Sequence, residues 1–137
     1  MKISKKTDYA LRSLFTLIEC YGSNPVPLRE LAMRNNMPRG FLEHIMLELK
    51  AQGWVDSTPG KNGGYLLARS PDEITMGQII RHFDGVLAPI KCVSITRHQS
   101  CSEEETCKFR SLFVNIRDYV ADLMDRSTLK QVYEGLA

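Results

Sequence analysis

Three short apolar periodicities, each ended by a glycine or proline break, dominate the first 53 residues of the chain. Apolar residues recur at spacings of three and four over 7–21, 28–35 and 39–52, which predicts three helices. The second and third are separated only by Asn36-Met37-Pro38, a break typical of a helix-turn-helix. So short a connection makes the two helices cross closely, and this restricts the fold more than any other feature.

A hairpin is predicted directly after the third helix. Gly53 ends that helix, and the extended runs 54–58 and 65–68 flank a glycine-rich tip at 59–64. Thr75 can cap a short helix over 76–83, and apolar residues return at helical spacing from Phe109 to Met124. The pattern predicts a mainly α fold, in which a winged helix-turn-helix carries a small β-hairpin wing and a long C-terminal helix follows.

The domain organisation follows from these elements. We expect a winged helix-turn-helix DNA-binding domain at 1–85, a cysteine-containing loop at 86–107, and a dimerisation helix with a C-terminal tail at 108–137. The long helix has an apolar face and no partner of matching length within the chain, which favours packing on its twin in a homodimer.

Composition limits the compartment and the class of partner. Of 137 residues, 43% are hydrophobic and 25% charged, which argues against wholesale disorder, and no apolar run approaches the roughly 20 residues of a membrane span. Asp8, Arg12 and Glu19 interrupt the only stretch that resembles a signal peptide. We therefore expect a cytoplasmic protein without a membrane partner, in which thiols are kept reduced.

Charge and spacing together point to double-stranded DNA. Through Ser70 the chain has ten Lys/Arg against six Asp/Glu, and after it eight against ten. In a winged helix-turn-helix the third helix enters the major groove; its residues off the apolar stripe are Arg39, Gly40, Glu43 and His44. Among these, Glu43 can accept from a cytosine amino group. Candidate phosphate contacts are Lys5, Lys6, Arg12, Lys50 and Lys61. Helix-turn-helix spacing also occurs in modules that bind proteins, and that alternative stays open.

Three of the four cysteines lie in CVSITRHQSCSEEETC, residues 92–107. Cys92, Cys101 and Cys107 are separated by eight and five residues, which matches neither a zinc ribbon nor a ferredoxin. Thiolates on a flexible polar loop suit an iron–sulfur cluster, and free thiols forming a disulfide switch are the alternative. Cys20 and the methionines, Met33 among them, are interpreted as packing residues, and Trp54 is expected to pack the hairpin onto the helices.

The pattern does not favour an enzyme. The sequence has no Ser-His-Asp pattern, glycine-rich phosphate loop or paired carboxylates, and His44, His82 and His98 lack evident triad partners. We interpret Glu103-Glu104-Glu105 as the acidic first turn of the long helix, capped by Ser102.

The segments MKISKKTDYALRSL, LRELAMRNNMPRGFLEHIMLELKAQGWV and NGGYLLARSPDEITMGQII resemble the Rrf-two family of bacterial transcription regulators. The resemblance implies a homodimeric winged-helix DNA binder, usually a repressor, and often one that senses nitric oxide, iron or redox state. In cluster-binding members, three cysteines at this place hold an iron–sulfur cluster, here 4Fe-4S in preference to 2Fe-2S. Members commonly have arginine where this chain has Pro59, a role that Lys61 can take over.

The fourth cluster ligand is also suggested by the resemblance. Some members have a histidine at the position of Arg110, which cannot ligate, and others use an aspartate in the first helix of the opposite subunit, here Asp8. His98 in the loop is the competing ligand. The alternative function is a cluster-free regulator of the same family, controlled by thiol oxidation or by binding a metabolic enzyme; such members generally lack the cysteine trio.

Overall fold

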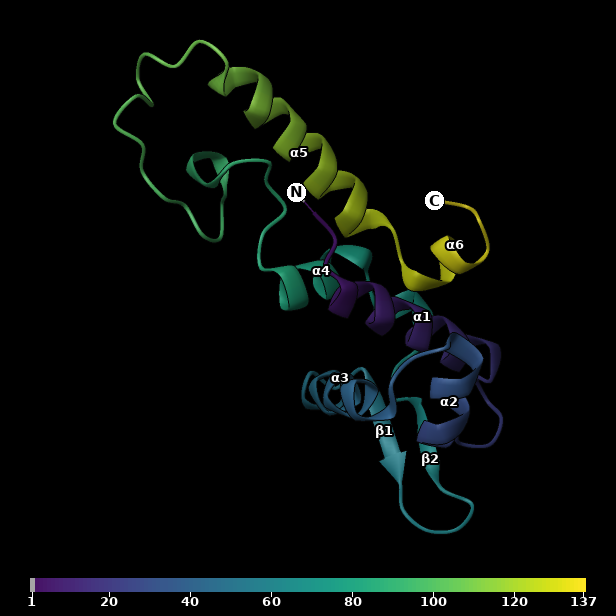
Figure 1. The fold of residues 1–137 in the computed structure, drawn as a ribbon. Coiled ribbons are helices and arrows are strands. Elements are labelled where there is room, and N and C mark those ends of the chain that lie inside the picture. The colour runs from purple at the N-terminus through teal and green to yellow at the C-terminus, as the bar shows by residue number, and fades with distance from the viewer. Residues whose placement is uncertain (1) are drawn as a thin grey trace.

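The computed structural model of the protein describes residues 2–137, so Met1, where the predicted first domain begins, lies outside the described residues. It is mainly helical with one two-stranded antiparallel hairpin, which confirms the predicted fold class (Figure 1). The elements, in chain order, are α1 Lys5–Glu19, α2 Leu28–Asn35, α3 Arg39–Ala51, β1 Val55–Thr58, β2 Gly64–Leu67, the 3-10 turn η1 Pro71–Glu73, α4 Met76–Asp84, the 3-10 turn η2 Lys91–Val93, α5 Arg110–Arg126 and α6 Leu129–Tyr133.

Helix α1 begins two residues before the predicted start because Ser4 caps it. The Ser4 hydroxyl accepts from the Thr7 amide at 3.2 Å, which satisfies one of the unpaired amides of the first turn. The buried face of α1 packs against α2 and α3, and Leu14, Leu42 and Ile45 are fully buried there. These three helices form the helix-turn-helix core.

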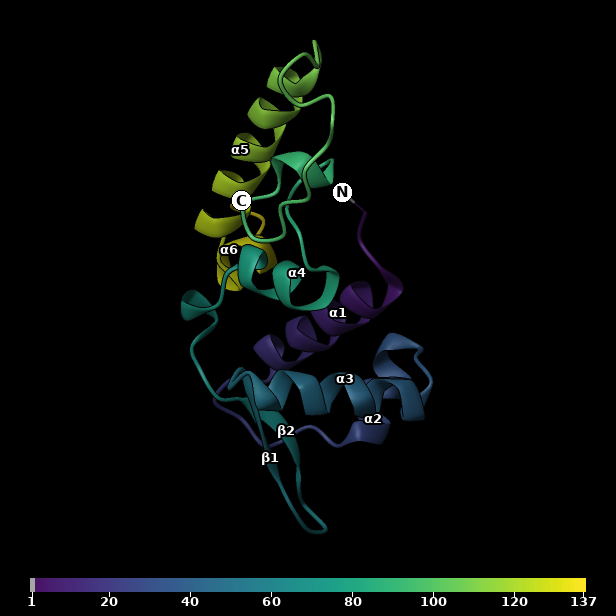
Figure 2. The same ribbon diagram turned by 90° about the vertical axis from the view of Figure 1, so that its left-hand side faces the viewer.

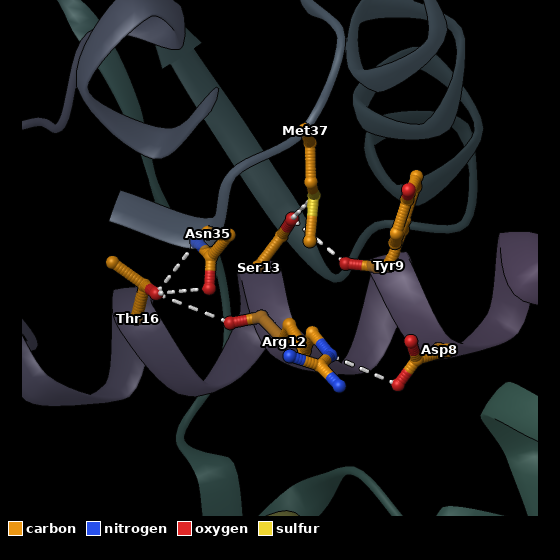
Figure 3. Close-up of polar contacts among 7 residues, drawn as sticks. All are labelled: Asp8, Tyr9, Arg12, Ser13, Thr16, Asn35 and Met37. Atoms are coloured by element: carbon orange, nitrogen blue, oxygen red, sulfur yellow. Dashed lines mark hydrogen bonds and ion pairs between the residues drawn. The ribbon is translucent and has the colours of Figure 1, made fainter. Parts of the chain in front are cut away.

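Polar side chains fix α1 to the connection between α2 and α3 (Figure 3). The Ser13 hydroxyl donates to the Tyr9 carbonyl at 2.9 Å and contacts the Met37 sulfur at 3.9 Å. One turn later, the amide nitrogen of Asn35 donates to the Thr16 hydroxyl at 3.0 Å. Helix α1 is therefore joined by polar contacts both to the last residue of α2 and to the connection that follows it.

The wing is an antiparallel hairpin in which Val55 pairs with Leu67 and Thr58 with Gly64. Val26, before α2, adds to it by exchanging two backbone hydrogen bonds of 2.8 Å with Tyr65. A side chain at Gly64 would collide with the Val26 carbonyl, and one at Gly63 with the Thr58 carbonyl. The paired glycines are therefore required by close backbone approach. Trp54 is 6% exposed in the core beside the hairpin, in accordance with its predicted packing role.

The C-terminal segment returns to the winged-helix core. Leu129 of α6 is fully buried in the same apolar cluster as α1 and α3, and its amide donates to the Ile74 carbonyl at 2.8 Å. Thr75 and Thr128 form an isolated bridge, and each caps the helix that follows it with a reciprocal capping box. Helix α6 was not predicted. The division of the chain at 85 and 107 stays a prediction.

Helix α5 extends away from the winged helix, with the irregular cysteine segment beside its N-terminal end and the wing at the opposite end of the molecule (Figures 1 and 2). It begins at Arg110, so the interpretation of Glu103–Glu105 as its first turn is wrong. These residues form turns because Glu104 is engaged locally: its Oε1 atom accepts from the Cys101 amide and lies 3.1 Å from His98 Nε2. Met33, interpreted as packing, is instead 77% exposed on α2.

Candidate DNA-binding surface and cysteine segment

The predicted base readers lie together on the exposed side of α3. Leu42, Ile45, Met46 and Leu49 are fully buried, and the opposite face at the N-terminal end presents Arg39, Gly40, Glu43 and His44 to solvent. The exposed face begins in the first turn, after Pro38, where the helix amides are not satisfied by a side chain. Such a face can enter a major groove without disturbing the core. That these four residues read bases stays a prediction.

Glu43 also acts electrostatically on the wing. Burial raises the pKa of the Tyr65 phenol on β2, and the negative charge of Glu43 raises it further. The carboxylate of α3 and strand β2 of the wing therefore belong to one electrostatic environment.

The side chains predicted to contact phosphate differ in their exposure and in whether another side chain already contacts them. Lys61, at the wing tip, is exposed, and it lines a shallow hollow with Arg29 near the start of α2. Lys50 donates to the Ser57 hydroxyl on β1 at 2.6 Å, and Lys5 lies over the Tyr9 ring, 5.6 Å from its centroid. Arg12 is exposed and pairs with Asp8. These side chains remain near the surface of α1, α3 and the wing.

Lys6 is held more firmly than the others. Its ammonium donates to Oε1 of Glu48 on α3 at 2.8 Å, and it lies over the Phe83 ring of α4. The second oxygen of Glu48 is 3.7 Å from Nε2 of His82, also on α4. Lys6 thus connects α1 to the recognition helix, a relationship that no sequence spacing indicates because the three helices are far apart along the chain.

Asp8 lies in the first turn of α1, where its charge favours the helix dipole. Its Oδ1 atom accepts from Nε of Arg12, one turn later, at 3.0 Å, and the carboxylate is 47% exposed (Figure 3). The group is therefore accessible from outside the chain, and its only described partner is an exposed side chain.

The three thiols of the cysteine segment differ in how exposed they are. All four cysteines are free thiols. Cys92 lies in η2 between exposed Lys91 and buried Val93, Cys101 is exposed, and Cys107 is half-buried. Among residues 2–137 of the single chain, no three Cys, His, Asp or Glu side chains are close enough to hold one metal ion. The chain by itself therefore does not bring Cys92, Cys101, Cys107 and Asp8 together.

Comparison with known proteins decides the family. Residues 3–135 match Rrf2, which is described as an iron-dependent transcriptional regulator. The chain belongs to the Rrf2 family. This confirms the resemblance drawn from the N-terminal, helix-turn-helix and wing segments.

The Rrf2 relatives are named as transcriptional regulators. A putative rrf2-like HTH-type regulator of Rhodobacter capsulatus is 34% identical over 95% of this chain and 91% of its own length. The HTH-type regulator CymR of Bacillus subtilis is 36% identical over 96% of this chain and 89% of its own. An IscR of Pectobacterium atrosepticum is 26% identical over 96% and 79%. The protein is thus a DNA-binding transcription regulator, and its relatives are regulators and not enzymes.

Solved structures agree with this assignment. CymR of B. subtilis, described as the global cysteine regulator, superposes with a TM-score of 0.84 at 34% identity and covers 98% of both chains. The oxidised form of Staphylococcus aureus CymR gives a TM-score of 0.78 at 32% identity over 98% and 97%. Among residues 2–137, each helix is too short or too polar to span a bilayer.

Proposed function

We propose that this Rrf2 protein is a homodimeric repressor that senses nitric oxide, iron supply or redox state through an iron–sulfur cluster held by Cys92, Cys101 and Cys107. One observation carries the proposal: three free thiols share a single irregular segment, between the winged helix and α5, that has almost no apolar material to bury them. Packing does not account for thiols in such surroundings, whereas ligation does.

The donor set fits a cluster of this kind. Thiolates are the soft ligands that iron–sulfur clusters require. Residues 95–103 are all exposed, and the two intervals of eight and five residues leave Cys101 and Cys107 free to approach Cys92. When bound, the cluster would supply a redox-active centre that small oxidants or nitric oxide can reach from solvent.

Asp8 is the proposed fourth ligand, donated by the other subunit. Its carboxylate is half-exposed and its partner Arg12 is itself 59% exposed, so the ion pair is worth at most about 1 kcal/mol and is easily given up. A hard carboxylate binds such a cluster weakly. Weak ligation suits a sensor because a signal molecule can displace it. His98, which is engaged with Glu104, is the competing ligand.

Helix α1 provides the connection to DNA recognition. Asp8 is only two residues from Lys6, whose ammonium is bonded to Glu48 on α3. A ligand bound at Asp8 therefore acts on the same helical turn that contacts the recognition helix. Two recognition helices must lie about one turn of DNA apart, so a small rearrangement alters affinity, and couplings of this kind typically amount to about 1–3 kcal/mol.

The proposed dimer uses α5. This helix has no buried residue, and large apolar side chains on one of its faces and at its N-cap are exposed to solvent. Phe109 is 60% exposed, Leu112 57% and Tyr119 68%. An apolar stripe of this length that the rest of the chain leaves uncovered favours a second copy of the same helix as its cover.

A second candidate is control by thiol oxidation without a cluster. It is favoured by the similarity to S. aureus CymR, which is described in an oxidised form. Here Cys101 is exposed and Cys92 and Cys107 are half-buried, so oxidants can reach them. In this case a disulfide among the trio would take the place of the cluster as the switch.

The test of the function is DNA affinity under anaerobic conditions, measured by fluorescence anisotropy on an operator selected in vitro. Loaded wild type and wild type stripped of iron should differ about 5- to 150-fold in affinity. Cys101→Ala should behave as the stripped protein in both preparations, and Cys20→Ala, which removes the cysteine outside the segment, should behave as wild type. Equal affinities for loaded and stripped wild type would refute cluster sensing, and a difference produced only by oxidant would favour the thiol switch.

A further inference from the structure

Two arginines of α5 bind the backbone at the first cysteine of the segment and at the residue after it. Nη2 of Arg110 donates to the Cys92 carbonyl at 3.0 Å, and Nη1 of Arg117 donates to the next carbonyl, that of Val93, at 2.8 Å. These are hydrogen bonds from charged donors, which are stronger than those between neutral groups. Two adjacent peptide groups of η2 are therefore fixed to one helix.

The spacing of the two arginines explains how they converge. They are seven residues apart, which places them on nearly the same side of α5 and about 10 Å apart along its axis. The two side chains start about two helical turns apart, and each is long enough to reach one of the two neighbouring carbonyls. Arg117 is only 19% exposed and is oriented from the other side by Asp118, whose Oδ1 accepts from its Nε and Nη2 atoms. The arrangement is a clamp and not a pair of loose surface contacts.

The rest of the segment is not held in this way. Val93 and Ser94, at the clamp, are buried, whereas every residue from Ile95 to Ser102 is exposed. The Lys91 carbonyl accepts from the Ser94 and Gln99 amides at 3.1 and 3.2 Å, so η2 is also the point at which the loop returns on itself. Cys92 is thus the fixed thiol, and Cys101 is carried on exposed backbone.

Arg110 has a further property that packing does not explain. Its Nε atom is buried and has no hydrogen-bond partner in the described chain. A charged donor that is buried and unpaired destabilises the fold unless a negative group faces it. A positive charge and a free N–H group therefore stand beside the peptide of Cys92.

We propose that Arg110 and Arg117 are positioning residues that fix Cys92 on α5 as the anchored ligand, and that Arg110 also stabilises negative charge at that ligand. The second part rests on the proposed cluster. Thiolate-bound clusters are anionic, and a nearby cation favours the more negative, reduced state. Because both arginines belong to the proposed dimerisation helix, the clamp joins the sensing loop directly to the subunit interface.

Amide hydrogen exchange in the iron-free full chain tests the clamp without any cluster. Arg110→Gln and Arg117→Gln should each accelerate exchange of the Val93 and Ser94 amides about tenfold, because a hydrogen bond to a charged group contributes at least about that factor. The matched control is Arg126→Gln, on the same helix, since Arg126 is 64% exposed and among residues 2–137 pairs only with Asp122. Unchanged exchange in both clamp variants, with unchanged circular dichroism, would overturn the clamp.

Reduction potential tests the role of the charge. In the loaded protein, Arg110→Gln should lower the ratio of reduced to oxidised cluster about tenfold at a fixed potential, a shift of about 59 mV for one electron. Arg110→Lys, which keeps the charge without the planar fork, should recover most of it, and Arg126→Gln should leave it unchanged. An unchanged potential in Arg110→Gln would overturn the charge role. If wild type binds no cluster, that role falls together with the proposed function, whereas amide exchange still decides the clamp.

Discussion

Lys6 on α1 and Glu48 on α3 are joined by a hydrogen-bonded ion pair of 2.8 Å between Nζ and Oε1. The same carboxylate lies 3.7 Å from His82 of α4, whose ring packs edge-on against Trp54. One acidic side chain on the flank of the recognition helix that faces α1 and α4 thus contacts both of these helices. The orientation of α3 is set by this contact as well as by its apolar face.

Lys6→Met should affect DNA binding differently from Lys61→Ala. The ammonium of Lys6 is engaged by Glu48, whereas Lys61 is exposed at the wing tip. Losing one phosphate contact lowers the slope of log affinity against log salt by about 0.9. We expect that change in Lys61→Ala and a nearly unchanged slope in Lys6→Met, measured by anisotropy titrations at several salt concentrations. An equal loss of slope in both variants would mean that Lys6 leaves Glu48 to bind phosphate.

The free energy of unfolding measures how much the Lys6–Glu48 pair stabilises the protein. The Lys6–Glu48 pair is more than one-third exposed on both sides, so it contributes at most about 1 kcal/mol to the free energy of unfolding. Lys6→Met and Glu48→Gln should each lower that free energy by this amount or less, and the double variant by no more than either one alone. Fully additive losses in urea unfolding would show that the two side chains act independently.

Alanine should stabilise the protein less at Gly77 than at Gly40. A Cβ at Gly77 on α4 would collide with the Asp125 carboxylate of α5, which accepts from Nη2 of Arg81 at 2.9 Å. That carboxylate is the end of a half-exposed side chain and can move aside at the expense of its ion pair with Arg81, so Gly77→Ala should lose up to about 1 kcal/mol that offsets its gain in helix propensity. At Gly40 on α3 a Cβ meets nothing within 4 Å, and alanine should stabilise by about 0.5–1 kcal/mol. The two midpoints of thermal unfolding check this, and equal gains for the two variants would mean that the Asp125 side chain does not lie over Gly77.

Leu129 allows the return of the C-terminus to be tested. It is fully buried in the winged-helix core, so Leu129→Ala should cost about 2–5 kcal/mol of unfolding free energy. Leu136 is 72% exposed nearby, and Leu136→Ala should change stability by less than about 0.5 kcal/mol. Similar small effects in urea unfolding of both variants would show that α6 is not part of the core.

In the proposed interface, Glu43 contributes to the preference of α3 for particular bases. Glu43→Gln removes the charge and presents an amide where a carboxylate can accept from cytosine. Selection of DNA sequences by this variant should lose the preference at one base pair while affinity for non-specific DNA is retained or increased. A uniform loss of affinity across all sequences would show that Glu43 does not read a base.

The sequence predicted those parts of the molecule that depend on local patterns. The apolar periodicity of α1, α2 and α3 and the glycine tip of the wing are local signals, and each element lies within two residues of its expected bounds. The start of α5 was misplaced because an acidic run can form either a first helical turn or a polar turn, and only the contacts of Glu104 with Cys101 and His98 decide between them.

The site was less predictable because it depends on contacts between distant segments. Nothing in the spacing of Lys6 and Glu48, or of Arg117 and Val93, indicates that they bond, since each pair is brought together by helix packing. Helix α6 has only five residues, too few for a periodicity to be recognised. The cysteine trio was visible in the sequence, but its anchoring to α5 was not.

The most direct test of cluster ligation is an anaerobic native mass spectrum of the dimer. Wild type and Cys20→Ala should carry the added mass of iron and sulfide, one cluster for each chain, and Cys101→Ala should carry none. Asp8→Ala should retain less than wild type after exposure to nitric oxide. A wild-type dimer at the mass of two bare chains, with every thiol titratable, would contradict the account.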